Sequence, residues 1–72
     1  MPRLPRVSGR EVIKALERIG FRQTRQRGSY AVMRRGDRGC TVPLHRELRL
    51  CTWSTMLTQA GVPIDELLNA LR

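Results

Sequence analysis

The hydrophobic pattern of this sequence changes its period twice, and no other feature limits the possible fold as much. Residues 8–20 place apolar side chains at helical spacing, residues 21–44 alternate as strands do, and residues 52–71 return to helical spacing. Two glycine-containing turns divide the middle region, which therefore predicts three short strands. The pattern predicts a single α+β domain, residues 1–72, in the order α-β-β-β-α-α. A three-stranded antiparallel sheet would carry the helices on one face.

The expected helices have recognisable ends. Ser8-Gly9-Arg10-Glu11 has the spacing of a capping box, and Gly20 is placed to end the first helix. Thr52 is the expected N-cap of the second helix and Gly61 its end, while Pro63 fits the start of the third. The connector 45–50 has room for one helical turn. The apolar stripes consist of Val12, Ile13, Leu16 and Ile19, then Trp53, Met56, Leu57 and Ala60, and finally Ile64, Leu67, Leu68 and Leu71.

The expected strands lie at residues 21–26, 29–35 and 40–44, with turns at Arg27-Gly28 and Gly36–Gly39. In the second strand Tyr30 and Arg34 share one face, and Ala31 and Met33 share the other. Pro43 indicates an edge strand or the end of a strand. The turn Gly36–Gly39 also spells GxxG, the clamp of KH domains. Because that clamp joins two helices, a plain hairpin turn is the favoured interpretation.

Arginine dominates the charged residues. Fourteen basic residues against six acidic ones give a net charge of +8, and all the basic residues except Lys14 are arginine. Residues 1–50 hold thirteen basic and four acidic residues, a net charge of +9. This excess indicates a polyanionic partner, because arginine forks suit phosphate oxygens. The alternative is that arginine only solubilises a small sheet. A DNA-binding helix-turn-helix at 52–72 is disfavoured, because its second helix presents Asp65 and Glu66 first. A helix pair that covers the sheet is favoured instead.

Several classes of protein are excluded by the same sequence. No apolar run approaches the roughly 18 residues of a membrane span, and the N-terminus lacks the apolar segment of a secretory signal. We therefore expect a cytoplasmic protein with Cys40 and Cys51 reduced. These two cysteines and His45 lack the paired spacing of a zinc site, so neither a metal nor another cofactor is expected.

Four segments together resemble the HicA family of toxins from HicA–HicB toxin–antitoxin pairs. They are SGREVIKALERIGF (8–21), RQRGSY (25–30), TVPLH (41–45) and LTQAGVPIDELL (57–68). The resemblance implies a fold like that of double-stranded-RNA-binding domains. It also implies metal-independent cleavage of messenger RNA and a HicB-type antitoxin as the partner.

The sequence departs from the family pattern at residue 30. Family members carry Gly-Ser-His, whose histidine is taken as catalytic, whereas this sequence has Gly28-Ser29-Tyr30. Metal-free RNA cleavage needs a base that works near pH 7, and a phenol with an ordinary pKa near 10 is ionised there only about once in a thousand molecules. Tyr30 and His45, the only histidine, are therefore the candidate catalytic residues.

We thus expect a HicA-type toxin, an endoribonuclease weakened by Tyr30. The alternative is a non-catalytic module of the same fold that binds RNA and the antitoxin. The expected RNA-binding residues are Arg22, Arg25, Arg27, Ser29, Arg34, Arg35 and Arg38.

Overall fold

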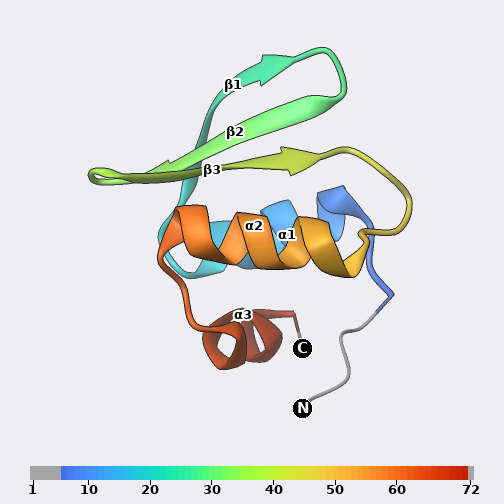
Figure 1. Cartoon of the computed structure of the whole chain (residues 1–72). Coiled ribbons are helices and arrows are strands. Elements are labelled where there is room, and N and C mark those ends of the chain that lie inside the picture. Colours follow the sequence, from blue (N-terminus) through green and yellow to red (C-terminus); the bar gives the residue numbers. More distant parts are fainter. Residues whose placement is uncertain (1–5, 72) are drawn as a thin grey trace.

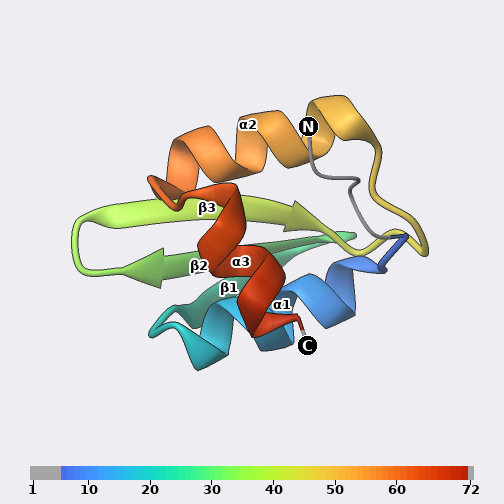
Figure 2. The same cartoon turned by 90° about the horizontal axis from the view of Figure 1, so that it is seen from below.

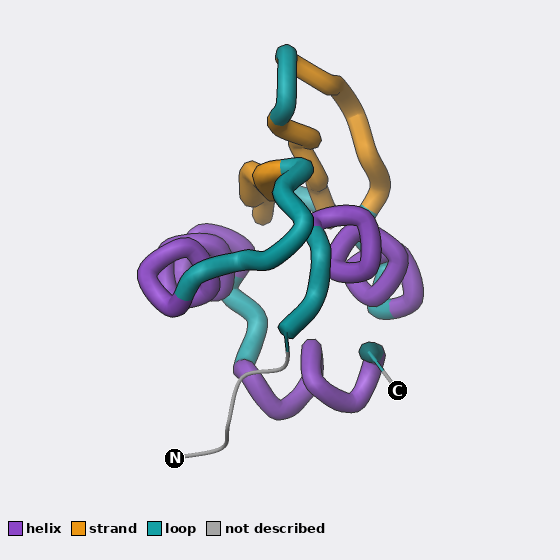
Figure 3. The backbone as a smooth tube through the Cα atoms, turned by 90° about the vertical axis from the view of Figure 1, so that its right-hand side faces the viewer, coloured by secondary structure: helices purple, strands orange, loops and turns teal. Residues whose placement is uncertain are grey.

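The computed structural model describes residues 6–71, and its elements follow the predicted order (Figure 1). They are α1 (Gly9–Arg18), β1 (Arg22–Arg27), β2 (Tyr30–Arg35), β3 (Arg38–Pro43), α2 (Leu50–Ala60) and α3 (Ile64–Ala70). The strands form one antiparallel sheet in the order β1-β2-β3. Helices α1 and α2 lie against one face of this sheet, and the opposite face is open (Figures 1 and 3). The predicted α+β architecture is therefore confirmed.

Helix α1 begins with the predicted capping box. The Ser8 hydroxyl accepts a hydrogen bond from the Glu11 backbone N–H, and the Glu11 carboxylate accepts one from the Ser8 N–H, both at 3.3 Å. These bonds satisfy donors that have no partner inside the helix. Gly20 follows the helix with a φ of 104°, a conformation that favours glycine. Both predicted ends of this helix are confirmed.

Of the two hairpin turns, the first is shifted by one residue from its predicted place and the second is shorter than predicted. Each has two residues and starts with glycine at positive φ, 58° at Gly28 and 61° at Gly36, as type II′ turns require. The first turn is Gly28-Ser29, one residue later than expected. The second uses only Gly36-Asp37, because Arg38 pairs with Arg35 and already belongs to β3. The GxxG segment is thus a hairpin turn continued into a strand, as favoured over the clamp of KH domains.

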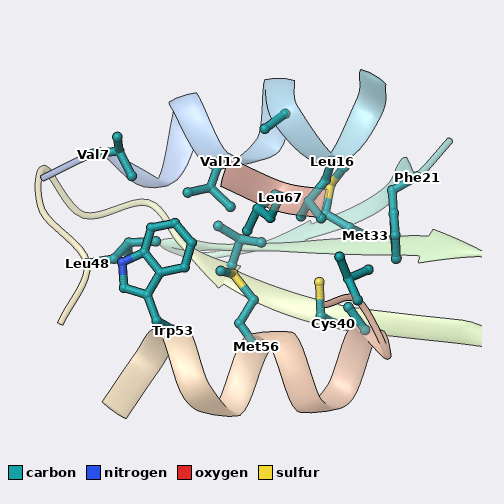
Figure 4. Close-up of a cluster of buried hydrophobic side chains, with 14 residues drawn as sticks. Val7, Val12, Leu16, Phe21, Met33, Cys40, Leu48, Trp53, Met56 and Leu67 are labelled. Atoms are coloured by element: carbon teal, nitrogen blue, oxygen red, sulfur yellow. The ribbon is translucent and has the colours of Figure 1, made fainter. Parts of the chain in front are cut away.

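The core lies between the sheet and the helices (Figure 4). Ala31 and Met33 of β2 are fully buried on the helix side, as the alternation predicted. Pro43 ends β3, which is an edge strand, so both of its predicted roles are confirmed. The largest buried side chains are Trp53, Phe21, Leu16, Met33, Met56, Leu67, Val12 and Val42.

The prediction that Thr52 caps α2 is wrong. The helix begins at Leu50, and its N-cap, Arg49, makes no side-chain capping bond. The entry to this helix is fixed by tertiary contacts, because Leu48 is buried and its N–H donates to the Val7 carbonyl at 3.2 Å. The connector 45–49 contains no helical turn. Gly61, at a φ of 67°, ends α2 as predicted.

Helix α3 does not cover the sheet as the predicted helix pair would. Figures 2 and 3 show it crossing beneath α1 and α2, on the side away from the strands. Because α1 and α2 already fill the covered face of the sheet, α3 packs beneath these two helices and contributes its buried Leu67 to the core (Figure 4). The Arg18 guanidinium donates to the Ala70 carbonyl at 2.8 Å and joins α3 to α1.

Candidate nucleic-acid interface

Four arginines project from the open face of the sheet. Residues that pair across antiparallel strands share a face, and β1 pairs Arg22 with Arg34, Arg25 with Val32, and Arg27 with Tyr30. Since Ala31 and Met33 point to the core, these pairs point to the opposite side. We call the set formed by Arg22, Arg25, Arg27, Tyr30, Val32 and Arg34 the open face.

The charge of the open face has no internal compensation. None of the residues in β1, β2 or β3 is acidic, and Arg22 lies directly opposite Arg34. Like charges in opposite positions of a sheet destabilise it. Every residue of β1 is exposed, so these guanidinium groups are accessible to an anion. The face can bind a chain of phosphates along its length.

Tyr30 and His45, the two candidate catalytic residues, lie next to each other although fifteen positions separate them. Their ring centroids are 6.4 Å apart, with the ring planes inclined by 57°. Tyr30 opens β2 and pairs with Pro43, the last residue of β3, so the chain reaches His45 two residues later. Both side chains are exposed. Two groups at this separation can contact the same phosphodiester.

Backbone hydrogen bonds hold the segment that carries His45. The Leu44 N–H donates to the Ser29 carbonyl at 2.7 Å, and the Gly9 N–H donates to the His45 carbonyl at 2.9 Å. A side chain at Gly9 would collide with the Pro43 carbonyl, so only glycine allows α1 to approach this closely. No local pattern marks Gly9 as required, because the requirement arises from a tertiary contact.

Arg35, although expected to bind RNA, points to the helix side of the sheet. Its guanidinium donates to the Ile19 carbonyl at 2.8 Å, lies 3.7 Å from the Glu66 carboxylate and stacks 4.8 Å from the centre of the Phe21 ring. Arg35 thus joins the end of α1 to α3.

Two other expected RNA-binding residues lie outside the open face, Arg38 at the start of the edge strand β3 and Ser29 in a turn. The Arg38 guanidinium lies beside Gly61 at the end of α2. Ser29 occupies the β1–β2 turn, directly before Tyr30, with an exposed side chain.

The two thiols differ in their surroundings. Burial raises the pKa of Cys40 to about 11, so this thiol is protonated at neutral pH, whereas Cys51 is exposed on α2. Within residues 6–71 no group of three or more histidine, cysteine and carboxylate side chains is placed to hold a metal ion. The same part of the chain contains no helix long and apolar enough to cross a membrane.

Comparisons with known proteins connect this architecture to a family. The model of a family described as the HicA toxin of bacterial toxin–antitoxin systems matches residues 9–62. A search of curated proteins gave no match. The matched segment runs from the first turn of α1 past the end of α2 and includes the open face, Tyr30 and His45. Since it makes up three quarters of the 72 residues, the chain belongs to the HicA toxin family.

Proposed function

We propose that this HicA-type toxin is a metal-independent endoribonuclease of low activity that acts on messenger RNA in the cytoplasm. One observation supports the proposal above all: the Tyr30 and His45 rings lie 6.4 Å apart at one end of a face that carries four arginines. Phosphates bound along this face would bring one phosphodiester between the two rings.

The proposed reaction uses the 2′-hydroxyl of the RNA as the nucleophile. His45 takes the proton of that hydroxyl, its oxygen attacks the adjacent phosphorus, and the bond from phosphorus to the 5′-oxygen breaks. Tyr30 gives its phenolic proton to the departing oxygen. The products are a 2′,3′-cyclic phosphate and a 5′-hydroxyl. Arg27, opposite Tyr30 in the sheet, stabilises the negative charge of the transition state.

The face of the sheet from which each arginine side chain projects decides whether we assign it a contact with an RNA phosphate. Arg22, Arg25, Arg27 and Arg34 contact the RNA backbone from the open face, and Arg38 contacts it from the start of the edge strand β3. Ser29, exposed in the turn before Tyr30, contacts the RNA there. Arg35 is left out of this set, because its guanidinium binds Ile19 and Glu66. Contacts of this kind supply affinity with little sequence preference.

The proposed antitoxin is of the HicB type and covers the open face with an acidic segment. The net charge of +9 over residues 1–50 supports this, since complementary charge favours the encounter. Affinity for the antitoxin should fall steeply as salt rises. An affinity that is constant between low and high salt would argue against coverage by an acidic segment.

RNA cleavage by the purified protein tests the proposed activity. We expect slow cleavage of a long RNA that continues in EDTA, leaves cyclic phosphate ends and is lost in His45→Ala. Arg46→Ala is the matched control, because Arg46 is the exposed neighbour of His45. Cleavage that stops in EDTA would contradict metal independence, and full activity of His45→Ala would remove His45 from the mechanism.

A second candidate function is a non-catalytic module that binds RNA and the antitoxin. It is favoured by Tyr30, because a phenol gives up a proton far less readily at neutral pH than the imidazolium of a histidine in the same position would. The same assay separates the two candidates. The second candidate would be favoured if the parent protein binds RNA without cleaving it and if its over-expression does not stop growth.

A further inference from the structure

A groove runs along the junction of β3 and α2, which lie side by side in Figures 1 and 2. It consists of two adjoining hollows of about 260 and 470 Å³ that share Thr41 and Gln59. Tyr30 forms part of the wall at one end, and Arg34 and Arg38 form part of the wall at the other. We call this feature the β3–α2 groove. It shares Tyr30, Val32 and Arg34 with the open face, and side chains of α2 form its other wall.

The two ends of the groove differ in chemistry. The smaller hollow is lined by uncharged groups, with the Tyr30 ring, Pro43 and Met56 as apolar surfaces and the Thr55 hydroxyl as a polar one. Tyr30, 46% exposed, is the one large apolar side chain exposed in the described part of the chain. The larger hollow is lined by Arg34, Arg38 and one carboxylate, that of Asp37, so its charged side chains sum to +1. A flat uncharged surface next to cations matches a nucleotide, whose base is planar and whose phosphate is anionic.

We propose that the β3–α2 groove seats one nucleobase of single-stranded RNA beside the phosphate bound at Tyr30, and that Gln59 and Thr55 read the edge of that base. This inference rests on the proposed RNA binding. The base stacks on the Tyr30 ring, and the next phosphate reaches Arg34 and Arg38. Stacking holds the base, and hydrogen bonds to its exposed edge select it.

The position of Gln59 supports its assigned role. Its side-chain oxygen accepts the Thr41 N–H at 3.4 Å and so covers the free edge of β3. The amide NH₂ group of the same side chain then serves as a donor to a base edge in the groove. Thr52, Thr55 and Gln59 follow each other at helical spacing, i, i+3 and i+7, and all three line the groove.

Binding of four fluorescent homo-oligomers, of A, C, G and U, by the full chain tests the inference. The variants are Thr55→Phe, which fills the smaller hollow, and Gln59→Leu, which removes the amide. Ser54→Phe is the matched control, because Ser54 is exposed on α2 but does not line the groove. We expect the parent to prefer one oligomer. Thr55→Phe should weaken that binding about tenfold, the effect of losing one stacked base at roughly 1.4 kcal/mol, and Ser54→Phe should leave it unchanged.

Each other result has a definite meaning. Equal binding of all four oligomers by the parent, or an unchanged preference in Thr55→Phe and Gln59→Leu, would overturn the base site and leave RNA binding intact. No binding of any oligomer would overturn the proposed function itself. Circular dichroism checks folding of each variant, and if Thr55→Phe does not fold, Gln59→Leu decides, with loss of the preference supporting the base site.

Discussion

Arg34 and Arg35 are adjacent and identical in type, yet we expect their replacement by glutamine to have different effects. Arg35 makes a charged hydrogen bond to the Ile19 carbonyl, stacks on Phe21 and lies near Glu66. A hydrogen bond of a charged group contributes about 1.5–3 kcal/mol. The cation–π contact with Phe21 contributes about 0.5–1 kcal/mol, and the exposed ion pair with Glu66 adds little. Because the Arg35 side chain is 38% exposed, these contributions are partly reduced by solvent, and we expect Arg35→Gln to lower the free energy of unfolding by about 2 kcal/mol.

For a domain of this size, that loss should lower the melting temperature by about 10 °C. Arg34→Gln should not lower the melting temperature, because Arg34 is exposed and its removal relieves the repulsion from Arg22. It should instead weaken RNA binding and reduce the log–log salt slope by about 0.7, the contribution of one phosphate contact on single strands. Thermal unfolding and fluorescence anisotropy measure the two effects. Equal melting temperatures for the two variants, together with equal losses of RNA affinity, would refute the assignment of faces.

Three further predictions concern the rest of the fold. Gly9→Ala should destabilise the protein by about 1–3 kcal/mol in urea unfolding, because the added carbon collides with the Pro43 carbonyl; a stable variant would show that the close approach is not required. Ser8→Ala should cost about 1 kcal/mol through loss of the cap, and an unchanged unfolding midpoint would contradict this. Iodoacetamide at pH 7 should label Cys51 and spare Cys40 until the protein is unfolded, because burial raises the pKa of Cys40; mass spectrometry showing rapid labelling of both would disprove it.

Local patterns were sufficient to predict the order of elements. The capping box at Ser8, the glycines at 20 and 61, and the alternation of β2 each depend on neighbours in sequence, and the structure has all of them. The start of α2 could not be predicted in this way, because no side chain caps it. The contact of Leu48 with Val7 fixes the entry to α2, and these two residues are 41 positions apart in the sequence.

The candidate site was predictable in part for the same reason. Period-two alternation placed Tyr30 and Arg34 on one face of β2, which the structure confirms. The proximity of Tyr30 and His45 depends on the two-residue turn at Gly36-Asp37, which sets the register of β2 against β3. The sequence predicted a longer turn, so this proximity was not predictable. The role of Arg35 depends on Ile19 and Glu66, partners that periodicity cannot identify.

Cleavage of a long RNA by the parent and by Tyr30→His tests the central claim most directly. The substitution places an imidazole at the end of the open face, beside Arg27 and 6.4 Å from the position of the His45 ring if the imidazole occupies the place of the phenol. We expect the cleavage rate to rise about 10²-fold or more, the lower end of what one positioned acid–base group contributes, and to be unaffected by EDTA. A parent protein that already cleaves as fast as Tyr30→His would contradict the claim that residue 30 limits the reaction.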